Sequence, residues 1–83
     1  MKPTTYIANR RLILVTDRGE EIDISDFDLG RQEHFLDKLR AHEAGIIYND
    51  SFCPFAPHIN DRLIAQTELT IEALAKYRKK CSK

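Results

Sequence analysis

Two cysteines and three histidines are the residues of this chain best suited to metal binding or nucleophilic chemistry. The sequence contains no Cys-x-x-Cys and no His-x-x-x-His, the spacings typical of zinc sites. Two of the histidines lie eight residues apart, about two helical turns, which is too far for both to bind one ion. We therefore predict no metal and no cofactor. The residues considered are His34, His42, Cys53, His58 and Cys81.

A cysteine nucleophile needs a partly exposed, electropositive setting and a base that a third group orients. Cys53 pairs in sequence with His58 or His34, but Phe52 and Pro54 flank it, which predicts a buried thiol. Cys81 lies in a basic tail, which favours a more reactive thiol, yet no base is near it in the sequence. The pattern predicts that the protein is not an enzyme.

Six carboxylates fall within residues 17–28, and Arg18 is the one basic residue among them. They do not follow the pattern of a divalent-metal loop, in which alternating acids surround a glycine and a glutamate closes the loop. One interpretation is the solvated face of a hairpin, where charge discourages pairing with other chains. The other is an acidic surface that binds a basic partner or imitates a nucleic-acid backbone. The residues predicted to bind a protein partner in that second case are Glu21, Asp23, Asp26 and Asp28.

The chain ends in a basic tail, for which three interpretations stay open. Cations at a helix C-terminus complement the helix dipole. They also contact nucleic-acid phosphates without sequence preference, in a salt-sensitive way. Thirdly, the acidic run and the tail neutralise each other, within one chain or across a symmetric dimer. The nucleic-acid alternative rests on Lys76, Arg78, Lys79 and Lys80.

The longest consistent period predicts a helix from Asn60 to Lys80, with Asn60 as its N-cap. Leu69 points away from the apolar stripe of this helix. It is either a single exposed leucine or part of a second contact face for another subunit or a partner. The stripe itself comprises Leu63, Ile64, Ile71, Leu74, Ala75 and Cys81.

Earlier segments predict a small sheet and a second helix. Residues 11–16 and 21–25 form a hairpin in which Ile22 and Ile24 face the core, while Glu21, Asp23 and Ser25 face water. A helix follows between Asp28 and Ala44, and Gly45 ends it as a left-handed stop.

Residues 46–48 form a short third strand, and residues 52–58 form an irregular linker that Phe52 and Phe55 pin onto the core. These elements predict an α+β fold, a small antiparallel sheet with two helices packed on one face. We expect one domain over residues 1–83, with a loose lead-in at 1–5 and a loose tail at 81–83.

Composition limits the function further. Thirteen basic residues balance thirteen acidic ones in 83 residues, whereas a dedicated nucleic-acid binder usually shows a basic excess. No apolar run is long enough to span a membrane and no secretory leader is visible, so we expect a cytoplasmic protein. The interpretation favoured is a small non-enzymatic protein-binding module, a regulator or inhibitor of the kind that phages and mobile elements often encode, with homodimer formation left open. The alternative is a nucleic-acid-binding accessory protein.

Overall fold

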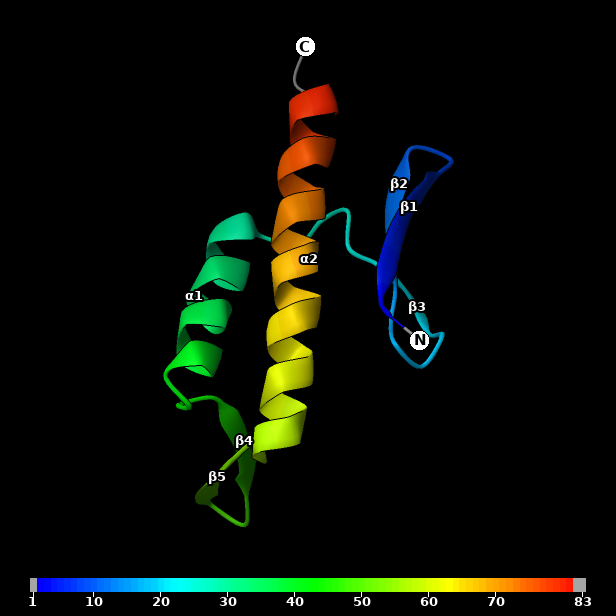
Figure 1. The fold of residues 1–83 in the computed structure, drawn as a ribbon. Helices are drawn as coiled ribbons and strands as arrows, with labels where there is room; N and C mark the ends of the chain where they lie inside the picture. Colours follow the sequence, from blue (N-terminus) through cyan, green and yellow to red (C-terminus); the bar gives the residue numbers. More distant parts are fainter. Residues whose placement is uncertain (1, 82–83) are drawn as a thin grey trace.

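The computed structural model describes residues 2–81 of the chain, and side chains as far as Lys79. Three strands form one antiparallel sheet in the order β1-β2-β3, and β4 and β5 pair as a separate antiparallel hairpin. This confirms the predicted α+β class with a small antiparallel sheet and two helices. The elements in chain order are β1 (Thr4–Ala8), β2 (Arg11–Val15), β3 (Glu21–Asp23), α1 (Leu29–Arg40), β4 (Gly45–Tyr48), β5 (Ser51–Pro54) and α2 (Pro57–Cys81) (Figure 1).

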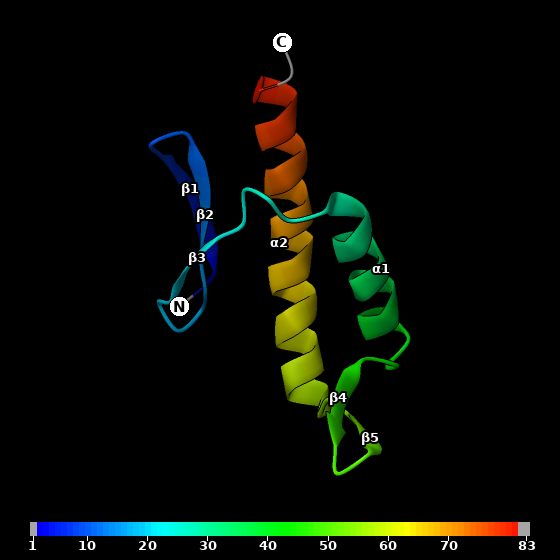
Figure 2. The ribbon, with the colours of Figure 1, turned by 180° about the vertical axis from the view of Figure 1, so that it is seen from behind.

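Helix α2 lies at the centre of the molecule. The three-stranded sheet packs against one side of it and α1 packs along another, an order that Figures 1 and 2 show from opposite directions. Both helices thus lie on one side of the sheet, and α2 makes the direct contact. The molecule is elongated, 44 × 26 × 21 Å, and the β4–β5 hairpin extends beyond the N-terminal end of α2 (Figure 1).

The core between the sheet and α2 follows the alternation of β2. Leu12 and Leu14 are buried, whereas Ile13 and Val15 are half-buried on the opposite face, because successive strand residues point to opposite faces. Leu12, Leu14, Ile24 and Leu74 form the buried cluster. The predicted lead-in at residues 1–5 is wrong at its end, because β1 already begins at Thr4 and pairs with Val15.

Strand β3 is shorter than predicted, ending at Asp23, and the burial of Ser25 and of Ile22 differs from the prediction. Ser25 is 7% exposed, and its Oγ accepts a hydrogen bond of 2.7 Å from the backbone N–H of Leu12. Serine was expected to face water because it is polar, but here it satisfies a buried backbone donor. Ile24 is fully buried as predicted, while Ile22 is 41% exposed.

Helix α1 starts and ends with two different caps. The Asp28 carboxylate accepts a hydrogen bond of 3.1 Å from the N–H of Gly30, as an N-cap should. At the other end His42 has a φ of 58°, and the N–H groups of His42 and Glu43 donate to the carbonyls of Leu39 and Lys38. This is a Schellman motif. The predicted stop at Gly45 is therefore wrong, since the left-handed residue is His42.

Helix α2 begins three residues before the predicted N-cap. Pro57 is its first residue, a position where the missing N–H costs nothing. Asn60 lies inside the helix, 1% exposed, and its side-chain Nδ2 donates a 2.8 Å hydrogen bond to the Leu39 carbonyl of α1. The N-cap prediction is wrong: Asn60 joins the end of α1 to the first turn of α2.

The predicted apolar stripe of α2 does not coincide with the face of the helix that the structure buries. Leu69 packs against the core cluster and does not point away into solvent, whereas Ala75 is exposed. The side chain of Cys81 lies outside the described residues. The prediction failed because, as far as Lys79, three of the four buried residues of the helix are polar, so a pattern of apolar residues alone misplaces its buried face. Those four positions are Asn60, Thr67, Thr70 and Leu74.

Candidate interaction surfaces

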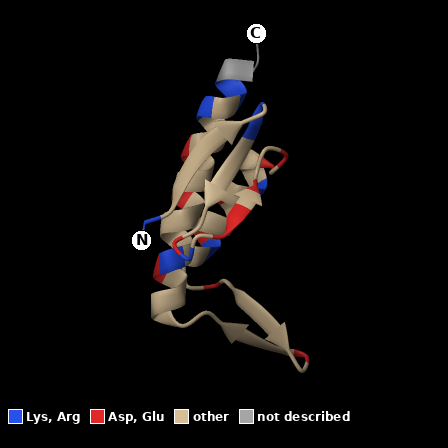
Figure 3. Ribbon diagram, turned by 90° about the vertical axis from the view of Figure 1, so that its right-hand side faces the viewer, with Lys and Arg blue, Asp and Glu red and all other residues tan. Residues whose placement is uncertain are grey.

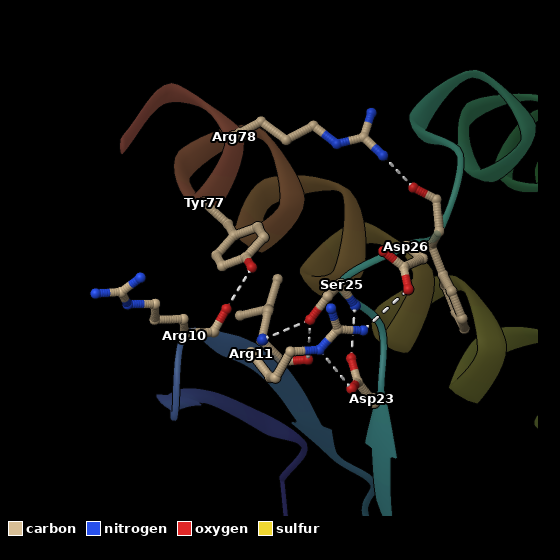
Figure 4. Close-up of polar contacts among 9 residues, drawn as sticks. Arg10, Arg11, Asp23, Ser25, Asp26, Tyr77 and Arg78 are labelled. Carbon is tan, nitrogen blue, oxygen red and sulfur yellow. Dashed lines mark hydrogen bonds and ion pairs between the residues drawn. The ribbon is translucent and has the colours of Figure 1, made fainter. Parts of the chain in front are cut away.

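The carboxylates of the predicted acidic surface form ion pairs and hydrogen bonds with other residues of the chain. Arg11 of β2 donates to Asp23 from Nε and to Asp26 from Nη2, both at 2.9 Å (Figure 4). The Asp23 carboxylate also accepts a 2.9 Å hydrogen bond from the N–H of Ser25. The Arg11 guanidinium, with help from Ser25, lowers the pKa of Asp23 to about 2. These two acids therefore serve to fix the turn after β3.

Asp17, at the start of the β2–β3 turn, forms a two-pronged ion pair with Arg62 of α2. The Nε–Oδ2 and Nη2–Oδ1 distances are 2.7 and 2.8 Å. This contact lowers the pKa of Asp17 and raises that of Arg62. Three of the six carboxylates in the acidic run are thus paired within the chain, Asp17 with Arg62 and both Asp23 and Asp26 with Arg11. Neutralisation of the run by the basic tail stays a prediction.

The remaining predicted acids also have partners. Glu21 accepts a hydrogen bond from the Tyr6 hydroxyl, which raises the pKa of Tyr6. Asp28 caps α1 and lies 3.8 Å from the Arg31 guanidinium. All four acids predicted to bind a partner thus already have a contact inside the molecule, and binding through them stays a prediction.

The predicted nucleic-acid tail is partly engaged in contacts within the chain. Lys76 pairs with Glu72 at 3.1 Å, one turn away. Arg78 donates to the backbone carbonyl of Phe27, ahead of α1 (Figure 4). Between them, the Tyr77 hydroxyl donates to the Arg10 carbonyl at 2.6 Å. Lys79 lines a groove described below. The side chain of Lys80 lies outside the described residues.

The cysteine and histidine side chains that the structure describes are exposed. Cys53 is exposed on β5, so the expectation that Phe52 and Pro54 bury it is wrong. His34, His42 and His58 are exposed as well. In the described part of the chain, no group of three or more His, Cys, Asp or Glu is arranged to hold a metal ion.

The β4–β5 hairpin carries four of the seven exposed large apolar side chains among the described residues, and the sequence did not predict it as a unit. Ile46, Ile47, Tyr48 and Phe52 are 56%, 70%, 65% and 53% exposed. Neither strand packs on a helix or on the three-stranded sheet within residues 2–81. Figure 3 shows the hairpin as an uncharged arm that projects from the body, with an acidic residue at its turn. That residue is Asp50.

The local chemistry explains why this arm forms. Asn49 and Asp50 have φ values of 50° and 63°, as the two central residues of a type I′ turn require. Ile47 pairs directly with Phe52, so these two side chains lie on one face of the hairpin. At the base, a Cβ on Gly45 would lie 2.1 Å from the Cys53 carbonyl oxygen. Glycine is therefore required for the strands to approach.

A signal for the hairpin was present in the sequence. Asn49-Asp50-Ser51 separates two short apolar segments, residues 46–48 and 52–53, and a short polar turn between such segments is the pattern of a hairpin. The prediction instead made residues 52–58 an irregular linker because of Pro54 and Pro57. That linker prediction is wrong: Ser51–Pro54 is a strand, and Phe52 does not reach the core. Pro54 ends the strand, where a missing donor is tolerated.

A second apolar feature is a groove of about 630 Å³ between the edge strand β1 and the C-terminal half of α2. Its walls are mostly apolar and its charged residues are two lysines. Tyr6 and Ile7 of β1 are 43% and 50% exposed along it. The lining residues are Thr5, Tyr6, Ile7, Leu12, Ala73, Lys76, Tyr77 and Lys79.

Comparisons with models of known protein families, with curated proteins and with solved structures each return no match. None of the helices among residues 2–81 combines the length and the hydrophobicity needed to cross a lipid bilayer. The arrangement of side chains is therefore the basis for any functional proposal.

Proposed function

We propose that this protein is a small, non-enzymatic, cytoplasmic binding module that regulates or inhibits another protein by covering part of its surface. The observation that carries the proposal is the exposure of the β4–β5 hairpin. It presents four large apolar side chains, and within residues 2–81 its strands contact only each other. Its binding element is thus the face formed by Ile47 and Phe52 together with the face formed by Ile46 and Tyr48.

Energetics support a binding role for the arm. An isolated two-stranded hairpin is marginally stable in water and needs packing against another surface. Burying one large aliphatic or aromatic side chain stabilises a complex by roughly 1.5–3 kcal/mol. Four such side chains on one short hairpin are a typical set of binding anchors, and within residues 2–81 neither strand that carries them packs on a helix or on the three-stranded sheet.

The hairpin also limits the chemistry of its partner. Both of its faces are apolar, and Asp50 at the turn is its one charged residue. A complementary site is therefore an apolar cleft with a positive charge where the turn ends, since an unpaired charge at such an interface opposes binding.

The experiment is a tagged pull-down from the native host, after nuclease treatment, with three forms of the protein. They are the wild type, the hairpin variant Ile47→Asp/Phe52→Asp and the control Ile22→Lys. Ile22 is 41% exposed on β3, so it controls for the loss of an exposed apolar side chain elsewhere. We expect a stoichiometric protein partner with the wild type and the control, and its loss with the hairpin variant.

Two results contradict the proposal. A partner that binds the hairpin variant as well as the wild type moves the binding element elsewhere. Recovery of nucleic-acid-associated proteins alone, lost on nuclease treatment, favours the alternative of nucleic-acid binding through Lys76, Arg78, Lys79 and Lys80. A salt-dependent gel shift that disappears on deletion of residues 78–83 would then establish that alternative.

A further inference from the structure

We propose that the groove between β1 and α2 receives the β4–β5 hairpin of a second copy of this chain, so that the free protein is a reciprocal two-fold dimer. The inference rests on the proposed function, in which the hairpin is the binding element. When no other partner is present, we infer that the hairpin binds the groove of a second copy. Two unpartnered apolar surfaces of one chain are thereby covered at once.

The groove has the chemistry that the hairpin requires. Its walls are apolar, with Ile7 half exposed on one side and Ala73 partly buried on the other. Lys76 and Lys79 are the charged residues among its lining, and Lys76 already balances Glu72 at 3.1 Å. No carboxylate is among the lining residues. The acidic turn of the hairpin is opposite in charge to these two lysines, as Asp50 is its one charged residue.

Size and shape also agree. Strands of four residues are about 13 Å long. The groove, at about 630 Å³, lies within the range of sites that enclose drug-sized ligands. It therefore has room for two neighbouring side chains of one hairpin face. Ile47 and Phe52 form that face, because they are direct cross-strand partners.

The hairpin cannot reach the groove of its own chain. It joins α2 at Pro57, whereas the groove begins at Ala73, sixteen residues and about 24 Å further along the helix. The hairpin also points away from the C-terminal end of α2 (Figure 1). A second copy whose α2 runs antiparallel brings each hairpin to the other chain's groove. A contact of this kind occurs twice and closes the assembly.

The first test measures the mass in solution across a concentration series, by light scattering after gel filtration and by sedimentation velocity. We expect a concentration-dependent dimer for the wild type and for the control Ile22→Lys. Both the hairpin variant Ile47→Asp/Phe52→Asp and the groove variant Ile7→Glu weaken the dimer by ~100-fold or more, because each removes an anchor twice per dimer. Far-UV circular dichroism verifies the overall fold of each variant, and amide hydrogen exchange of residues 46–53 verifies that the hairpin variant keeps its hairpin, because two like charges face each other in it.

The decisive test mixes the two defective variants. A heterodimer of the hairpin variant with the groove variant keeps one intact hairpin-in-groove contact, whereas each homodimer keeps none. We expect the mixture to dimerise more tightly than either variant alone, and less tightly than the wild type. The exchange Asp50→Lys should weaken the wild-type dimer, and Lys76→Glu/Lys79→Glu on the other chain should restore it.

The outcomes separate this inference from the proposed function. A wild-type monomer, or a dimer that the hairpin variant breaks and Ile7→Glu leaves intact, overturns the hairpin-in-groove contact. If the pull-down partner is still lost with the hairpin variant, the proposed function stands without it. Failure of the mixture to dimerise also overturns the inference, since the intact contact it preserves would then contribute nothing.

Discussion

Replacing Asn60 by aspartate distinguishes two roles that differ sharply in energy. At a helix N-cap, Asn and Asp stabilise about equally well, so the substitution there would be nearly neutral. In the structure Asn60 is instead buried, and its Nδ2 donates to the Leu39 carbonyl at 2.8 Å. A carboxylate at this position has no proton to donate, and it would place a negative charge against a carbonyl oxygen.

The expected loss follows from these contacts. Leaving a buried polar group without its partner costs about 1–3 kcal/mol, and more when the group is charged. We therefore expect Asn60→Asp to lower the free energy of unfolding by roughly 3 kcal/mol or more at pH 7. Asn60→Ala, which loses the hydrogen bond without gaining a charge, should cost roughly 1–3 kcal/mol. A domain of 83 residues has about 4–12 kcal/mol in total, so either loss is large.

The assay is urea unfolding followed by circular dichroism, at pH 7 and at pH 5. Burial would raise the folded-state pKa of the new aspartate above its unfolded value. Its penalty should then grow as pH rises and shrink at pH 5, while the penalty of Asn60→Ala stays the same. An Asn60→Asp protein as stable as the wild type at pH 7 would refute the buried role and restore the N-cap interpretation.

Three further predictions test other contacts. Gly45→Ala should open the β4–β5 hairpin, because its Cβ would lie 2.1 Å from the Cys53 carbonyl oxygen; amide hydrogen exchange should then rise in residues 46–53 and not in α1. Ser25→Ala should cost about 1–2 kcal/mol in urea unfolding, since it orphans the buried N–H of Leu12. The depressed pKa of Asp23, about 2, stabilises the fold above the unfolded value near 4, and that stability is lost as pH falls towards 2. Asp23→Asn should therefore flatten the acid limb of an unfolding curve measured from pH 5 to pH 2; an unchanged limb would contradict the Arg11 contact.

The class of fold was predictable from the sequence because its elements carry strong local patterns. The β2–β3 hairpin follows from alternation, and the N-terminus of α1 follows from Asp28. The position of α2 was predictable to within three residues. These features depend on neighbours in the chain, and neighbours are what a sequence shows directly.

The parts that failed depend on contacts between distant residues. Asn60 has the sequence pattern of a helix cap, and only its contact with Leu39 shows a different role. Leu69 was placed on the exposed face because the period of the apolar residues does not reveal that Thr67 and Thr70 also face inward. The internal pairing of the acidic run follows the same rule, since Asp17 and Arg62 are 45 residues apart.

The candidate binding surface was missed for a different reason. A polar turn at Asn49-Asp50 between two apolar segments indicates a hairpin. The prediction was an irregular linker because two prolines lie nearby. The apolar character of Phe52 and its neighbours was then taken as a sign of burial. Exposure of Ile47 and Phe52 is a property of the whole fold, because it depends on no other element covering them.

The central position of α2 has a consequence for how the chain acquires its structure during synthesis. Both the sheet and α1 pack against this helix, yet it is the last of the seven elements to leave a ribosome. Until it emerges, Leu12, Leu14, Leu36 and Leu39 have no surface to cover them. The nascent chain should therefore stay unfolded and protease-sensitive until α2 is translated. Folding should then proceed in one late step, with contacts such as Tyr77 to Arg10 spanning 67 residues.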